Sequence, residues 1–464
     1  METYTVEDRD KCLKWLLSAC RTWLCHARQT RSESGSGLAP SKSLDSGQVA
    51  PPGNQEPPPA QPKGETRIAR PAIEKPLSEG SPDGDLPEEK PPGREFPGGE
   101  SLNGEGIPSL TVPPDLNRDT LKQMAYFQGI APILYDLIRQ NILPKDNLPP
   151  NIVTDWERTY FSNVIQNTRF TELLSRIASH SSEQNIPVIA LKGMASTAAL
   201  YKDLGLRSMA DIDLLCRTRD LIPLRDILHS LGFAPKGSLQ AHHIAYHHPG
   251  LGILVECHFA LQYIVNNKKE LLSLFWEHRR PARIDEARFP ILSTEDQLLF
   301  EMAHIADHVY HVSLKHYLDF AGWLTLGHAD IDWDYLTSLL NKSGMIAGFA
   351  SLTRVLSEIL QIPIKIPLQE DIPPKKINGL KNTLFSSLRD TGFIKTPLTA
   401  TRIKSYATLT QKVGFTLRKL FPSPPVIRAT YNTSSSITSF FSYPYHIAKT
   451  LLDFRSRKKR EQLS

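Results

Sequence analysis

The chain has 464 residues and a formal net charge of +5, with 54 Lys and Arg residues against 49 Asp and Glu residues. A charge this modest for the length does not predict sequence-specific binding to nucleic acid. No run of about eighteen apolar residues occurs, so a transmembrane helix is not expected.

The five cysteines form no CxxC pair; they are Cys12, Cys20, Cys25, Cys216 and Cys257. Their odd number, and the position of two of them in predicted strands, indicate reduced thiols. A cytoplasmic location is therefore expected, and a secreted, disulfide-linked protein is not.

Residues 1–29 are predicted to form a short amphipathic helix, since apolar side chains recur at helical spacing. They are Leu13, Leu16, Leu17, Cys20 and Leu24. The acidic start and the charges of Lys14 and Arg21 argue against a signal peptide. Two interpretations stay open: the helix docks onto a protein partner or a membrane surface, or it packs against its own chain.

Residues 30–114 are rich in Pro, Gly, Ser and Glu, with hardly an aromatic residue. Such a composition cannot bury enough apolar surface to offset its conformational entropy. We therefore predict a disordered linker over this range.

Residues 115–185 are predicted to be a helical leader, with helices over about 119–141 and 152–184 separated by prolines. Residues 186–292 are predicted to be an α/β core. Its strands are expected at 188–191, 211–216 and 253–259, and its helices at 194–201 and 220–231. The connection that carries His242, His243, His247 and His248 is interpreted as a loop near the mouth of a cleft.

Acidic and basic side chains gather around these strands. Because side chains alternate along a strand, Asp211 and Asp213 share one face, and Glu256 and His258 share one face of another strand. Three carboxylates can thus converge on one spot, where a cation such as Mg²⁺ would hold them together. Lys192, beside the amides at the predicted helix start, adds an anion site.

Residues 293–375 are predicted to form a helical domain, with one helix running from Thr294 to about Leu326 and two more over 333–340 and 346–360. His304, His308 and His311 would share one face of the first helix. Pocket-lining or buried histidines are preferred there over a metal site, because no further ligands occur at matched spacing. Lys315 and Asp319, four residues apart, are interpreted as a pair.

Residues 376–464 are predicted to be a loop-rich helical C-terminus with a basic tail, Arg455 to Arg460. Such a tail is either a solvated terminus or a site with affinity for nucleic acid or anionic lipid. The second interpretation would place the protein at the inner face of a membrane.

The motifs of the core, taken together, resemble an uncharacterised nucleotidyltransferase-like family of bacteria, a branch of the DNA polymerase β-type nucleotidyltransferase superfamily. They are Leu191-Lys192-Gly193, Leu200-Tyr201, Leu206-Arg207, Asp211-Ile212-Asp213, Leu231-Gly232-Phe233 and Glu256-Cys257-His258. The resemblance implies an α+β fold, in which a small mixed β-sheet nucleotidyltransferase core is flanked by helices and followed by a helical C-terminal region.

The resemblance also implies roles for single residues. Asp211, Asp213 and Glu256 would be the catalytic carboxylates and the ligands of two Mg²⁺ or Mn²⁺ ions. Gly193 would be the phosphate-loop glycine, but Met194 stands where the superfamily has a serine. Lys192, Ser196 or Thr197 is expected to compensate. Arg207 would reach a phosphate or, as the alternative, form a salt bridge that secures its loop.

The predicted function is Mg²⁺-dependent transfer of a nucleoside monophosphate from an NTP to a hydroxyl of a small molecule, sugar or protein. A catalytically inactive nucleotide-binding or scaffold protein is the first alternative, favoured by Met194. A metal-dependent phosphohydrolase centred on His304, Asp307 and His308 is a weaker one.

Overall fold

In the computed structural model, the described residues are 5–33 and 110–389, apart from 237–241, 262, 265, 328–330 and 369, together with 413, 416–417, 420–431, 433 and 440–452. The chain divides into two compact units, Met1–Pro40 with Ile107–Ser464, and Ser41–Gly106. Everything described here belongs to the first unit. Residues 34–109 of the predicted linker and the basic tail lie outside the described residues.

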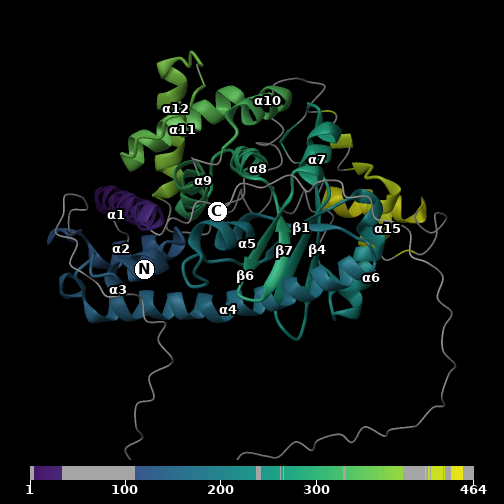
Figure 1. Cartoon of the computed structure of the whole chain (residues 1–464), viewed down its shortest axis with the longest axis horizontal. Coiled ribbons are helices and arrows are strands. Elements are labelled where there is room, and N and C mark those ends of the chain that lie inside the picture. The colour runs from purple at the N-terminus through teal and green to yellow at the C-terminus, as the bar shows by residue number, and fades with distance from the viewer. Residues whose placement is uncertain are drawn as a thin grey trace, which may run out of the picture. The chain divides into compact units, whose positions relative to one another are not determined.

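A seven-stranded mixed sheet, with strand order β3-β4-β5-β2-β1-β7-β6, forms the centre of the fold (Figure 1). Its middle strands are β1 (Val188–Ala190), β2 (Ile212–Cys216) and β5 (Ile253–His258). β2 runs antiparallel to β1 and parallel to β5. All residues of β1 and β2 are buried, which explains their almost uninterrupted apolar sequences. The predicted α+β class is confirmed.

The remaining four strands were not predicted from the sequence; they are β3 (Ala234–Pro235), β4 (His243–His248), β6 (Arg280–Ile284) and β7 (Ala287–Ile291). The most consequential is β4, because the prediction of a loop at His243, His247 and His248 is wrong. β4 pairs antiparallel with β5 and buries Ile244 and Tyr246 between half-buried histidines. That alternation is typical of a strand with one apolar face.

Three helices precede the sheet: α2 (Arg118–Phe127), α3 (Ala131–Arg139) and α4 (Pro150–Glu183). The prediction of one helix over 119–141 is wrong, because Gly129 adopts a positive φ of 71° between α2 and α3. A glycine reaches this left-handed conformation without steric cost, and it ends α2 there. α4 begins at the predicted proline pair.

Within the core, α5 (Lys192–Ser196) continues into a turn of π-helix (Thr197–Tyr201), and α6 (Leu221–Ser230) follows β2. α7 lies between β5 and β6, and α8 to α12 and α15 follow the last strand. Their bounds are Lys268–Glu277, Thr294–Asp307, Leu314–Leu326, Trp333–Ser343, Ile346–Leu360, Pro374–Leu388 and Pro424–Tyr431. In Figure 1, α8 to α12 gather at the top of the view, and α4 runs along the bottom.

The prediction of a single helix from Thr294 to Leu326 is wrong. α8 ends at Asp307, and Val309 and Tyr310 have positive φ values of 51° and 59° before α9 begins at Leu314. His311 therefore lies outside both helices, so His304, His308 and His311 do not share one helical face. The helix start is close to the prediction, with the Ser293 side chain accepting a hydrogen bond from the Asp296 amide.

α1 (Val6–Glu33) packs its apolar face into the core of the same unit. The predicted apolar residues of this face are buried, and α1 lies beside α2 and α11 (Figure 1). The Trp15 indole donates to the Thr111 carbonyl at 2.8 Å, and Arg21 donates to the Gln361 side chain at 2.7 Å. These contacts match the interpretation of a helix packed against its own chain. No described helix is long and apolar enough to cross a membrane.

Candidate active site

A cavity of about 480 Å³ lies beside the sheet, where the end of β5, the start of β2, the first residues of α5, and helices α8 and α9 meet. Most of the side chains singled out in the sequence line it. They are Lys192, Gly193, Arg207, Asp211, Asp213, Glu256, His258, His304, Asp307 and His308. Residues far apart in the chain thus form one polar cleft.

Asp213 is the best-connected carboxylate of this cleft. Its Oδ1 accepts hydrogen bonds from Lys192 Nζ at 2.8 Å and from His258 Nε2 at 2.7 Å. Burial by itself would raise the pKa of Asp213, but the adjacent Lys192 ammonium and the His258 hydrogen bond hold the pKa well below its usual range. Asp213 is consequently ionised at any physiological pH.

Glu256 lies next to Asp213 because β2 and β5 pair in parallel with these two residues in register. Its carboxylate oxygens lie 3.5 Å from His243 Nε2 and 3.6 Å from His258 Nε2. Burial would raise the pKa of Glu256, but the nearby imidazoles of His258 and His243 lower it overall. His243 was predicted to lie in a loop, and its register on β4 places it within this site instead.

Asp211 lies one residue before β2, not within the strand as predicted, and its side chain lines the same cavity. Burial and the charge of Asp213 raise the pKa of Asp211 to about 7. Asp211, Asp213 and Glu256 therefore line one cavity, and the negative charge of the three carboxylates exceeds what Lys192 alone compensates.

The start of α5 brings backbone close to these carboxylates. Lys192 has a positive φ of 45°, an uncommon conformation for a residue other than glycine. A Cβ atom at Gly193 would come within 2.5 Å of Met209 Sδ, so only glycine lets the Met209 side chain pack here. Met194 and Ser196 are buried and do not line the cavity.

Arg207 is buried in an ion pair with Asp319 of α9. Its Nε lies 2.9 Å from Asp319 Oδ2 and its NH2 group 2.6 Å from the same oxygen, while the Tyr201 hydroxyl donates to Oδ1 at 2.7 Å. The guanidinium is 3 % exposed and the carboxylate 0 %. Of the two interpretations given for Arg207, phosphate contact or salt bridge, the structure has the salt bridge. The predicted pair between Lys315 and Asp319 is wrong: Lys315 Nζ donates to the Ser208 carbonyl at 3.0 Å.

The loop that leads to Asp211 is held from the other side by amide side chains of α4, which were not predicted to take part in the site. Asn167 donates to the carbonyls of Leu204 at 2.6 Å and Arg207 at 2.8 Å. Gln166 donates to the Met209 carbonyl at 2.8 Å. Side-chain amides on a long helix carry no sequence signal for this role.

Residues 114–361, more than half of the chain, match the model of a family described as "Uncharacterised nucleotidyltransferase". The chain belongs to this family. No curated protein matches the sequence.

Solved nucleotidyltransferases show weaker similarity to the chain. The antibiotic-resistance factor ANT(2'')-Ia in a crystal structure with adenylyl-2''-tobramycin is 17 % identical, over 39 % of this chain and 98 % of that protein, with a TM-score of 0.30. In its solution structure, the same protein is 18 % identical over 40 % of this chain and 97 % of that protein, with a TM-score of 0.30. An antigenic nucleotidyltransferase-like protein from Paracoccidioides brasiliensis is 17 % identical over 43 % of this chain and 94 % of that protein, with a TM-score of 0.28. The family assignment rests on the match to residues 114–361.

Histidines of α8 and α9 line another part of the cavity in this nucleotidyltransferase. The His304 ring centroid lies 4.7 Å from that of His308 and 5.3 Å from that of His316. Burial, together with the charges of Lys192 for His304 and of Arg207 for His316, keeps both pKa values well below the usual range, so these imidazoles are neutral. Among the described residues, two groups have the spacing of metal ligands, and neither includes His304, Asp307 or His308.

Proposed function

We propose that this nucleotidyltransferase moves a nucleoside monophosphate from an NTP to a hydroxyl of an acceptor, in a reaction that depends on Mg²⁺ or Mn²⁺. The observation that supports the proposal is that Asp211, Asp213 and Glu256 line one cavity, next to Lys192 and Gly193. Nucleotidyl transfer needs carboxylates that hold cations against the phosphates, and it needs little covalent chemistry from the protein.

The carboxylates fit divalent cations. Asp213 and Glu256 offer oxygen atoms within 4.8 Å of each other, and carboxylate oxygens are the ligands that Mg²⁺ prefers. Burial and the charge of Asp213 raise the pKa of Asp211, and a cation bound beside Asp211 would favour its ionised form. Asp211 and Asp213 would hold the two ions, with Glu256 as the third ligand. When bound, such ions activate the attacking oxygen and neutralise the leaving pyrophosphate.

Lys192 has a separate role in the proposal. Its ammonium now neutralises Asp213 at 2.8 Å, and it is free to turn to the NTP phosphates once cations compensate that carboxylate. The acceptor oxygen then attacks the α-phosphorus, and the bond to the pyrophosphate oxygen breaks. The proton of the acceptor hydroxyl passes to a cleft carboxylate, for which Glu256 and Asp211 are the candidates.

The acceptor side of the cavity is expected to be formed by α8 and α9. Neutral His304 and His316, with His308, offer both hydrogen-bond donors and acceptors, which suits hydroxyl groups. The hydroxyl can belong to a small molecule, a sugar or a protein. Cell extract contains all three classes, so it is the appropriate first source of acceptors.

The test is a transfer assay with each of the four NTPs labelled at the α-phosphate, in Mg²⁺ and cell extract. Asp211→Asn and Asp213→Asn should each lower transfer about a hundredfold or more, because each removes charge that acts on the transferred group. Asp226→Asn, at an exposed acid of α6, is the matched control and should transfer as the unaltered chain does. Undiminished transfer by both cleft variants would overturn the proposal.

One observation favours a nucleotide-binding protein without catalysis. Met194 and Ser196 are buried away from the cavity. The first turn of α5 can therefore bind a phosphate through backbone amides, but it presents no hydroxyl group to that phosphate. In that case nucleotides would raise the melting temperature, but no NTP would yield pyrophosphate. Measured pyrophosphate release would exclude this alternative.

A further inference from the structure

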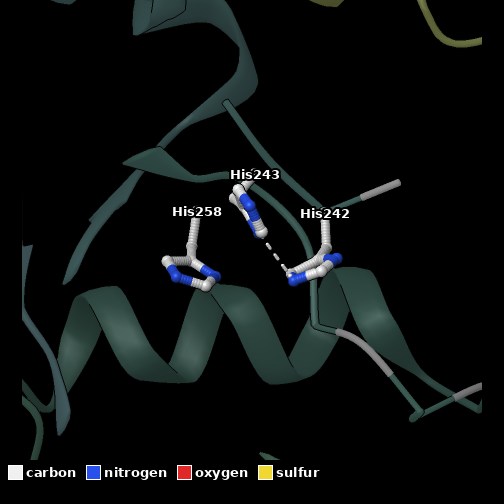
Figure 2. Close-up of side chains that lie close together, drawn as sticks. All are labelled: His242, His243 and His258. Carbon is white, nitrogen blue, oxygen red and sulfur yellow. Dashed lines mark hydrogen bonds between the residues drawn. The ribbon is translucent and has the colours of Figure 1, made fainter. Parts of the chain in front are cut away.

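Three histidines converge on the wall of the cavity formed by β4 and β5, next to the cleft carboxylates. His242 precedes β4, His243 begins it, and His258 ends β5 (Figure 2). Each offers one ring nitrogen, and these nitrogens all lie within 4.8 Å of one another. His243 and His258 face each other directly across the strand pair, since they are in register.

The ring nitrogens are divided between two sets of partners. His243 turns Nδ1 to His242 Nε2, at 2.8 Å, and Nε2 to Glu256, at 3.5 Å. His258 turns Nε2 to Asp213, at 2.7 Å, and Figure 2 shows its other ring nitrogen on the side of His242. Each of these two imidazoles thus has one nitrogen toward a carboxylate and one toward the centre of the histidine cluster.

This division is the arrangement found around protein-bound transition metals. A histidine that binds a metal through one nitrogen commonly donates its other N–H to a carboxylate, which fixes the orientation of the ring. Here that outer partner is Asp213 for His258 and Glu256 for His243. Imidazole nitrogens suit Zn²⁺, Ni²⁺ and Cu²⁺, whereas Mg²⁺ prefers oxygen ligands.

We propose that His242, His243 and His258 form a binding site for a transition metal of the Zn²⁺ class, distinct from the carboxylate site for Mg²⁺. Three imidazoles leave a fourth coordination position of a tetrahedral ion for water or substrate. All three histidines line the cavity, so an ion that they bind would lie at its wall. Through its two carboxylate partners the histidine site would fix the orientation of Asp213 and Glu256, and so connect metal occupancy to the neighbouring cleft.

The experiment is metal binding by the full chain without a histidine tag and without nucleotide, so its outcome does not depend on whether transfer occurs. After treatment with a chelator, Zn²⁺ is titrated by calorimetry in excess Mg²⁺, and Co²⁺ is added in parallel to read coordination from its visible absorption. We expect one Zn²⁺ per chain, not displaced by Mg²⁺, and the intense absorption of four-coordinate Co²⁺ with nitrogen ligands.

Variants locate the ion. His242→Ala and His243→Gln should each weaken Zn²⁺ binding by at least about tenfold, the lower end of what a metal site loses when even an outer partner is removed. His247→Ala changes a half-exposed histidine of the same strand and should bind Zn²⁺ unchanged. No tight Zn²⁺ binding by the unaltered chain would overturn the proposal. Unchanged binding by both His242→Ala and His243→Gln would also overturn it, since the ion would then lie at Asp213, Glu256 and His258.

Discussion

Asp211 and Asp213 are two residues apart and line the same cavity, yet their pKa values move in opposite directions. Asp213 has Lys192 and His258 within hydrogen-bonding distance, whereas Asp211 is buried beside the charge of Asp213 with Lys192 farther away. In a cleft of low dielectric, the immediate partner decides which carboxylate stays ionised. The same reasoning applies to Glu301, a buried acid of α8.

Glu301 is a single residue whose charge makes stability depend on pH. It is fully buried, and its side chain interacts with Gln297. Burial and the charge of Asp319 raise the pKa of Glu301 from 4.5 to about 8. Because the folded state binds this proton more tightly than the unfolded state, the stability it contributes is fully present below pH 4.5 and is lost as pH rises through 8.

Glu301→Gln should therefore flatten the dependence of stability on pH. Glutamine resembles the protonated acid, so the variant and the unaltered chain should unfold alike near the low end of this window. Toward its high end the variant should be more stable, by a few kcal/mol at most. Urea unfolding across the pH range measures the difference, with the exposed Glu286→Gln as control. A stability difference that does not change with pH would contradict the prediction.

At the scale of elements, the loop between the π-helix and β2 is the part that places Asp211. α4 holds its carbonyls through Asn167 and Gln166, and α9 holds Arg207 through Asp319. Two helices that contribute few groups to the chemistry thus fix the approach to the carboxylates. The Arg207–Asp319 pair is buried, so breaking it leaves one charge without compensation.

Asp319→Ala should lower the free energy of unfolding by about 3–5 kcal/mol, because Arg207 would stay buried without its partner. Chemical denaturation measures the loss, and Asp334→Ala, at an exposed acid of α10, serves as control. Replacing both partners by apolar residues, Arg207→Met with Asp319→Leu, should recover part of the stability. A loss below about 1 kcal/mol for Asp319→Ala would contradict the prediction, because a loss that small is typical of exposed ion pairs.

The elements that were predicted correctly from the sequence are those whose pattern is visible in a short stretch of residues. The strands that carry Asp213 and Glu256 were predicted because apolar residues run through them and a polar residue ends the pattern. β4 was missed because the three histidines of the strand hide the apolar alternation of Ile244 and Tyr246. The break between α8 and α9 was missed because it depends on positive φ values at Val309 and Tyr310, residues with no preference for that conformation.

At the scale of the whole molecule, α1 completes the core although 76 residues, 34 to 109, separate it in sequence from the next described segment. Its Trp23 ring stacks on Tyr201 at 5.3 Å, and its Arg31 donates to the Ala199 carbonyl at 3.0 Å. Both partners belong to the π-helical turn that continues α5. The periodicity of α1 predicted an apolar face, but periodicity does not tell which surface covers it.

Leu16 tests whether α1 is part of the folded core. Its side chain is fully buried, so Leu16→Ala should lower the free energy of unfolding by about 2–5 kcal/mol through lost burial and the cavity left behind. Lys14→Ala, on the exposed face of the same helix, is the matched control and should change stability by less than about 0.5 kcal/mol. Both variants are compared by urea denaturation of the full chain.

Removal of α1 extends the same argument to the site. Because Trp23 packs on Tyr201, and Tyr201 donates to the Asp319 carboxylate that holds Arg207, α1 supports the loop of Asp211 through three contacts in series. A chain without residues 5–33 should expose the apolar surface that α1 covers and melt at a lower temperature. An unchanged melting temperature would mean that α1 is an appendage, and its apolar face would then be available to a partner.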